Sequence, residues 1–102
     1  KQKIEEKKYT KWFDYDKIKN SPCVRTRRQG DYLTVNSEGG RKKLNRIFID
    51  EKIPAEMRDR LPVVAAGSEI LWIPGGRMNE KYKITSTTGR VLELHYQGGA
   101  LA

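Results

Sequence analysis

The chain has 102 residues, the length of one ordinary domain, and 36% of them are hydrophobic, which is enough for a modest core and argues against a disordered segment. Lysine and arginine outnumber aspartate and glutamate by 21 to 13, and the resulting net charge of +8 favours a polyanionic partner, either nucleic acid or an acidic membrane surface. The chain has one cysteine and one histidine, which excludes an internal disulfide and a Cys/His metal site. No apolar run approaches the roughly 18 residues of a membrane-spanning helix. We therefore expect a cytoplasmic protein without a membrane partner.

The first third of the chain predicts three short strands. Residues 11–18 are rich in aromatic side chains and favour a strand, which Pro22 ends. Residues 23–27 alternate in polarity and predict a second strand with Arg25 and Arg27 on one outward face. A turn then precedes a third strand at 32–35. On the second strand we expect the thiol of Cys23 to be buried.

The middle of the chain predicts the helices. After a loop at 36–40, a helix is expected over 41–51, because Leu44, Ile47 and Phe48 fall at helical spacing. A second short helix is expected over 54–60, with proline in its first turn.

The last third predicts four more strands. Residues 63–66 and 69–73 flank a Gly-Ser turn and have the pattern of a hairpin. Residues 82–85 and 90–96 have the pattern of a second hairpin. The expected fold is therefore α+β and mainly β, with about seven short strands in a compact, sandwich-like domain and one or two short helices inserted around residues 41–60. We expect a single domain over 1–102, cut from a longer protein, because the chain begins with Lys1 and not with methionine.

Positive charge is concentrated between Arg25 and Arg46, where seven basic side chains face two acidic ones. From residue 61 to the end, four basic and three acidic residues nearly cancel. Two clusters account for the excess of positive charge, one at residues 25–28 and one at residues 41–46, and each adjoins a glycine turn. The alternative interpretation is that these charges form a solvated surface without a partner.

Each cluster suggests a way of binding phosphate. Arg25, Arg27 and Arg28 suit phosphates spaced along a nucleic-acid backbone, because each guanidinium can donate two hydrogen bonds. Gly39 and Gly40 precede the predicted helix, whose free N–H groups would attract an anion. The alternative there is a flexible loop that leads into a surface helix.

Several aromatic residues are candidates for base stacking. Trp12, Phe13, Tyr15 and Tyr32 are considered, although core packing is the alternative for each. Tyr32 is the best candidate for stacking because it follows the arginine cluster. Trp72 lies in an apolar run and is expected in the core. No arrangement of nucleophile, base and acid indicates a catalytic residue.

A series of sequence motifs, in the same order along nearly the whole chain, resembles the C-terminal domain of bacterial tRNA(Ile)-lysidine synthase. They are Arg25-Thr-Arg-Arg-Gln-Gly-Asp31, Gly40-Arg-Lys-Lys-Leu44, Phe48-Ile-Asp50, Lys52-Ile-Pro54, Arg58-Asp-Arg-Leu-Pro62, Ile70-Leu-Trp-Ile-Pro-Gly75 and Arg77. Thr10 to Ile18 is similar to the segment that leads into that domain. Two positions depart from the family's pattern: Gln29 stands where proline is common, and Tyr32 where arginine is common.

The resemblance implies a tRNA-binding accessory domain. The family's enzyme uses ATP, with magnesium, to attach lysine to the wobble cytidine of the isoleucine tRNA with a CAU anticodon. Its chemistry resides in a separate catalytic domain of the same chain, so this domain would be non-catalytic and would bind no cofactor or metal of its own. The resemblance implies contacts to the tRNA acceptor arm. The candidate contacts are Arg25, Arg27, Arg28, Tyr32, Arg41, Lys42, Lys43, Arg46, Arg58 and Arg60.

Two other classes of function remain. The chain could be a protein-interaction or dimerisation module, whose charge confers only solubility, and the parent enzyme could be a homodimer. An independent enzyme has the least support, because no catalytic constellation is assembled in the sequence.

Overall fold

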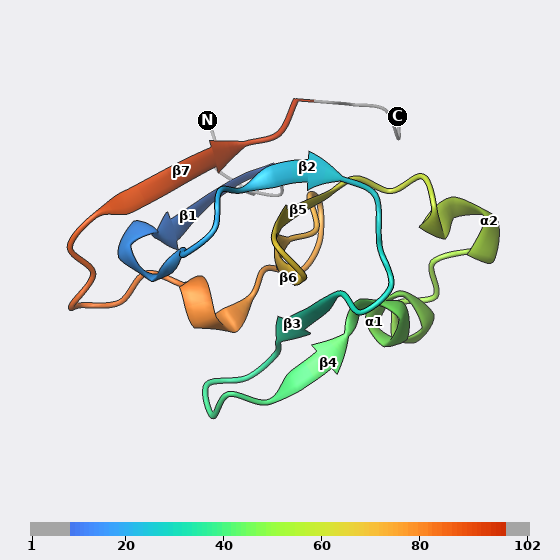
Figure 1. The fold of residues 1–102 in the computed structure, drawn as a ribbon, viewed down its shortest axis with the longest axis horizontal. Helices are drawn as coiled ribbons and strands as arrows, with labels where there is room; N and C mark the ends of the chain where they lie inside the picture. Colours follow the sequence, from blue (N-terminus) through green and yellow to red (C-terminus); the bar gives the residue numbers. More distant parts are fainter. Residues whose placement is uncertain (1–8, 98–102) are drawn as a thin grey trace, which may run out of the picture.

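The computed structural model describes residues 9–97, which form two β-sheets, two α-helices and two 3-10 helices (Figure 1). A two-stranded ribbon pairs β1 with β7, and a five-stranded sheet has the order β2-β5-β6-β3-β4. The strands are β1 (Thr10–Asp14), β2 (Cys23–Arg25), β3 (Tyr32–Thr34), β4 (Arg41–Lys43), β5 (Val63–Ala66), β6 (Glu69–Trp72) and β7 (Val91–His95). The helices are η1 (Tyr15–Lys17), α1 (Leu44–Asp50), α2 (Ala55–Arg58) and η2 (Glu80–Tyr82). The predicted class, α+β and mainly β with about seven short strands and one or two short helices, is confirmed.

The larger sheet has a hydrophobic cluster on each face. On one face, Leu44, Ile47 and Phe48 of α1 pack with Leu33, and with Val63 and other side chains of the sheet. On the other face, the ribbon covers a second cluster around Phe13 and Trp72. Because alternate residues of a strand point to opposite faces, β5 is buried on both sides. Trp72 is fully buried, as the sequence predicted.

A bulge in β6 explains why neighbouring residues share one cluster. Val64 is opposite Trp72 while Ala65 is opposite Ile70, which leaves Leu71 as an extra residue. Leu71 and Trp72 therefore both point towards the ribbon, where they belong to the second cluster.

The predicted helix over 41–51 is wrong at its start. Arg41–Lys43 form β4, which pairs with β3 in an antiparallel hairpin, and α1 begins at Leu44. The hairpin forms because the side chain of Asn36 accepts hydrogen bonds from the N–H groups of Glu38 and Gly40 and closes the turn. Gly39 takes a φ of 87° in this turn, which glycine adopts without strain. The glycines therefore serve a β-turn and not a helix start.

The end of α1 has the pattern of a Schellman motif. The N–H of Ile53 donates to the carbonyl of Phe48, and the N–H of Lys52 donates to the carbonyl of Ile49. Ile53 packs against the cluster that contains Phe48. Lys52 itself has a φ of 59°, in the left-handed region where glycine is usual.

The predicted strand over 82–85 is also wrong. That segment begins in η2, and only Lys83 makes an isolated bridge, to Phe13. The partner of β7 is β1, from the opposite end of the described chain. Thr88 closes a turn after η2 by hydrogen bonds to Thr85, so this stretch cannot lie beside β7 as an extended strand.

Two further expectations have different outcomes. The predicted hairpin at 63–66 and 69–73 is confirmed as β5 and β6. Cys23 was expected to be buried but is exposed, because β2 is an edge strand of the larger sheet. Within residues 9–97, every helix falls short of the length and apolarity needed to cross a membrane.

Candidate nucleic-acid interface

The hairpin of β3 and β4 places three of the predicted site residues on one face. Tyr32 is opposite Lys43, and Thr34 is opposite Arg41, so the side chains of Tyr32, Arg41 and Lys43 point to the same side. We call these three residues the hairpin face. Leu33 and Lys42 point to the other side, towards α1. The two faces of β4 therefore have different roles.

The hairpin face borders a hollow with a basic lining. The hollow has a volume of about 320 Å³ and is lined by Gly30, Tyr32, Arg41, Lys42 and Lys43. The Arg41 guanidinium lies over the Tyr32 ring, 4.6 Å from its centroid, a geometry that allows a cation–π interaction. Within residues 9–97, no carboxylate forms an ion pair with Arg41 or Lys43. Both charges are therefore available to an anion.

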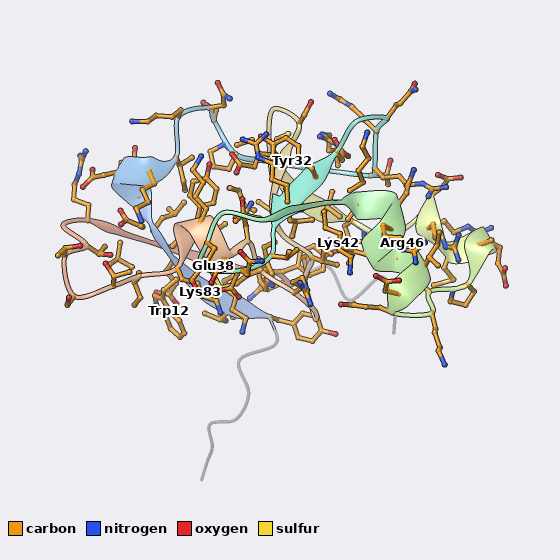
Figure 2. The ribbon with its side chains drawn as sticks, turned by 90° about the horizontal axis from the view of Figure 1, so that it is seen from below. Trp12, Tyr32, Glu38, Lys42, Arg46 and Lys83 are labelled. Carbon is orange, nitrogen blue, oxygen red and sulfur yellow. The ribbon has the colours of Figure 1, made fainter. Side chains whose placement is uncertain are left out.

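Lys42 and Arg46 share a single carboxylate on α1. Asp50 accepts from Lys42 and lies 3.3 Å from the Nε atom of Arg46. The hydrogen bond from Lys42 lowers the pKa of Asp50. Figure 2 shows Arg46 on α1, Lys42 beside that helix, and Tyr32 on β3. Their positive charge is therefore partly neutralised before any partner binds.

Arg25 is held inside the protein. Its guanidinium donates two hydrogen bonds of 2.9 Å to Asp31 and a third, of 2.8 Å, to the carbonyl of Gly67. The side chains of Arg25 and Asp31 are 10% and 2% exposed. The hydrogen bond to Asp31 raises the pKa of Arg25 further. The prediction that Arg25 and Arg27 share an outward strand face is wrong, because β2 ends at Arg25 and this side chain turns inward to Asp31.

The loop after β2 carries Arg27 and Arg28. Arg27 donates to Asp59 at 2.7 Å and to Asn45 at 2.9 Å, which links the loop to the helical region. The hydrogen bond from Arg27 lowers the pKa of Asp59. The backbone N–H of Arg28 donates to Asp31, while its side chain is exposed and has no ionic partner among residues 9–97. Arg28 is therefore the cation of this loop that is free to bind a partner.

The last two predicted contacts lie around α2. Arg58 is half-buried and donates to the carbonyl of Ile53, so it supports the connection between α1 and α2. Arg60 is exposed, and its side chain has no ionic partner in the described part of the chain. Neither residue lines the hollow at the hairpin.

Sequence reasoning missed two cations. A second hollow, of about 500 Å³, lies on the other side of Arg41. It is lined by Lys17, Thr34, Asn36, Ser37, Gly39, Arg41, Glu80, Lys81 and Thr85. Lys17 belongs to η1 and Lys81 to η2, and neither residue was among the predicted contacts. No local pattern marks these lysines, because only the fold brings them to the hairpin.

The side chains around the hairpin face are suited to binding a ligand. Arginine, lysine and tyrosine side chains on a hairpin suit phosphate groups and bases. Among residues 9–97, no group of three or more histidine, cysteine, aspartate or glutamate side chains is arranged to hold a metal ion.

Residues 23–94 match the family model described as the TilS substrate C-terminal domain. Among curated proteins, the chain is 50% identical over 88 residues to the tRNA(Ile)-lysidine synthase of Caldanaerobacter subterraneus subsp. tengcongensis, which is 86% of this chain and 19% of that protein. It is 41% identical over 90 residues to the protein of the same name from Clostridium tetani, again 19% of that protein. The chain thus spans about a fifth of the length of these relatives.

A solved structure, described as the crystal structure of a TilS C-terminal domain, superposes with a TM-score of 0.68 and 29% identity. The superposition covers 93% of this chain and 76% of the other. The resemblance that the sequence motifs indicated is thereby confirmed.

Proposed function

The chain belongs to the TilS substrate C-terminal domain family, and on that premise we propose that it binds the acceptor arm of a tRNA for a tRNA(Ile)-lysidine synthase. The observation that carries the proposal is the hairpin face. Arg41 and Lys43 project from one hairpin beside Tyr32, and no carboxylate among residues 9–97 pairs with either charge. Such a surface attracts a polyanion and fixes it in place.

The chemistry favours recognition of shape over recognition of sequence. The deep and narrow major groove of an A-form helix keeps base edges away from protein side chains, so cations contact phosphates and sugars. Each neutralised phosphate releases counterions, and binding therefore weakens steeply with salt. Arg28, Arg41 and Lys43 are the contacts that we propose first, with Arg60 as a more distant one. Arg27, Lys42 and Arg46 would contribute after exchanging their ion pairs, whereas Arg25 and Arg58 are retained for the fold.

The remainder of the proposal concerns the parent protein. The relatives carry the name tRNA(Ile)-lysidine synthase, and we propose that this chain is a non-catalytic part of such an ATP- and magnesium-dependent ligase in the cytoplasm. The catalytic domain of the same polypeptide would modify the anticodon's wobble cytidine. This domain would hold the far end of the same tRNA, and the parent would act alone or as a homodimer.

A pair of double variants tests the proposal. Arg41→Ala with Lys43→Ala removes two charges from the hairpin face, and Lys19→Ala with Lys52→Gly removes two exposed charges elsewhere. Affinity for tRNA is measured by gel shift between about 50 and 200 mM salt, the range over which phosphate contacts weaken most visibly. We expect the hairpin variant to lose about one unit of slope, in log affinity against log salt, for each phosphate contact removed. We expect the control variant to keep the parent's affinity.

The same assay separates the alternatives. An RNA hairpin with the sequence of the acceptor arm should compete with tRNA, and one with the sequence of the anticodon arm should compete weakly. Equal loss of affinity in both double variants would show that net charge, and not this face, determines binding. A salt-insensitive dimer that leaves tRNA unbound would favour a protein-interaction module.

A further inference from the structure

Two adjoining hollows share one side chain. The first hollow, lined by Gly30, Tyr32 and residues 41–43, meets the second hollow at Arg41, which lines both. The second hollow adds Lys17 and Lys81, whose ion pairs with Asp14 and Glu69 are long, at 4.0 and 3.8 Å. The carboxylate in its lining, Glu80, pairs with Lys83. A basic path therefore runs across the hairpin, from β4 to η2.

The linings of the two hollows differ in chemistry. The first combines an aromatic ring with cations, and the Arg41 guanidinium already stacks over Tyr32. Bases stack on aromatic rings and on guanidinium planes in the same way. The second hollow offers hydroxyl and amide groups beside its cations, from Thr34, Asn36, Ser37 and Thr85. Such groups donate to phosphate and sugar oxygens.

A duplex can present phosphates to these cations but cannot stack a base on the aromatic ring. Within an A-form helix, each base is stacked between its neighbours, so its flat face is not available to Tyr32. An unpaired nucleotide exposes that face, and its two flanking phosphates can reach cations on both sides of the ring. The aromatic ring is thus the feature that distinguishes an unpaired strand from a paired one.

We propose that the two hollows bind consecutive nucleotides of an unpaired RNA strand, with one base stacked on the Tyr32–Arg41 pair. Lys43 binds the phosphate on one side of that base, and the backbone continues past Arg41 towards Lys81 and Lys17. This inference rests on the proposed function, which names tRNA as the partner, and it adds that the strand at the hairpin is single-stranded. In a tRNA acceptor arm, the unpaired 3′ nucleotides are the segment that fits.

The test compares two RNAs and four proteins. One RNA is an acceptor-arm hairpin with its unpaired 3′ nucleotides, and the other is the same hairpin with a blunt end. The proteins are the parent chain, Tyr32→Ala, Tyr32→Phe and Tyr15→Ala. Tyr15 is the matched control because it is 44% exposed and also lies under an arginine, with Arg90 at 5.0 Å from its ring centroid. It lines neither hollow.

We expect the unpaired nucleotides to raise the parent's affinity by about tenfold, the value of one stacked base. Tyr32→Ala should abolish that gain, so that its affinities for the two RNAs become equal, while Tyr32→Phe and Tyr15→Ala should keep it. Equal affinity of the parent for both RNAs would overturn the inference while leaving tRNA binding intact. So would a Tyr32→Ala variant that loses affinity for both RNAs alike. Absence of salt-dependent binding to either RNA would instead refute the proposed function itself.

Discussion

The ion pair between Arg25 and Asp31 holds the loop between β2 and β3, and its removal should cost more stability than that of any exposed ion pair. Asp31 accepts two hydrogen bonds from Arg25 and a third, of 2.7 Å, from the N–H of Arg28. Asp31→Asn keeps the shape of the side chain but removes its charge. The guanidinium of Arg25, 10% exposed, then has no counter-charge.

The size of the effect follows from this burial. Loss of one partner of a buried pair costs about 3–5 kcal/mol. We expect the lower end, about 3 kcal/mol, because Arg25 keeps its hydrogen bonds to the carbonyls of Thr26 and Gly67. For a domain of this size, about 1 kcal/mol shifts the midpoint of thermal unfolding by roughly 4–8 °C, so the midpoint should fall by more than about 10 °C.

The matched control is Asp59→Asn. Asp59 also pairs with an arginine, Arg27, but is 77% exposed, so solvent screens this pair and its loss should cost much less stability than the loss of Asp31. Urea unfolding of both variants, followed by circular dichroism, gives the two free energies. If Asp31→Asn cost no more than Asp59→Asn, the structural role assigned to Arg25 would be wrong.

Three further predictions concern stability. Lys52→Gly should stabilise the chain by about 1 kcal/mol in urea unfolding, because it relieves the strain of a left-handed non-glycine residue. Burial and the hydrogen bond to Glu69 raise the pKa of Tyr82. The contribution of Tyr82 to folding stability is therefore complete below its ordinary pKa of about 10 and is lost as pH rises through its pKa in the folded state. Tyr82→Phe should therefore make stability less sensitive to alkaline pH, and equal pH dependence of the two proteins would contradict this. The hydrogen bond from Lys42 lowers the pKa of Asp50. The contribution of Asp50 to folding stability is therefore present above about pH 4 and is lost as pH falls through its pKa in the folded state. Asp50→Asn should lessen the decline of stability in acid, as measured by unfolding at a series of pH values.

Local patterns in the sequence were sufficient for the parts of the fold that depend on neighbouring residues. The apolar spacing of Leu44, Ile47 and Phe48 gave the buried face of α1. A short turn between two apolar runs gave the hairpin of β5 and β6. In both places the side chains that form the contact lie within a few residues of each other.

Long-range pairing was not accessible in the same way. The pattern of β7 identified a strand, but not its partner β1, whose residues lie about eighty positions earlier. Arg41–Lys43 adjoin a helical pattern in the sequence. They form a strand because the turn closed by Asn36 brings them into pairing with β3. The register between strands is set by tertiary packing, and the local propensities of residues carry no information about that packing.

The candidate site was predictable in composition and not in arrangement. The charged segment and Tyr32 were identified from the sequence, but the internal pairing of each cation was not. Arg25 and Lys43 look equivalent in the sequence, yet one is buried on Asp31 and the other projects from the hairpin. Lys17 and Lys81 carry no sequence signal, because they reach the hairpin through η1 and η2.

Mapping the tRNA contact on the chain itself tests the proposed interface most directly. Backbone amide resonances of the ¹⁵N-labelled chain are followed by NMR during titration with tRNA. We predict the largest shifts over residues 28–43, at Lys81 and at Lys17, with small shifts along β7. Shifts concentrated on the β1–β7 ribbon, with the hairpin unchanged, would contradict it.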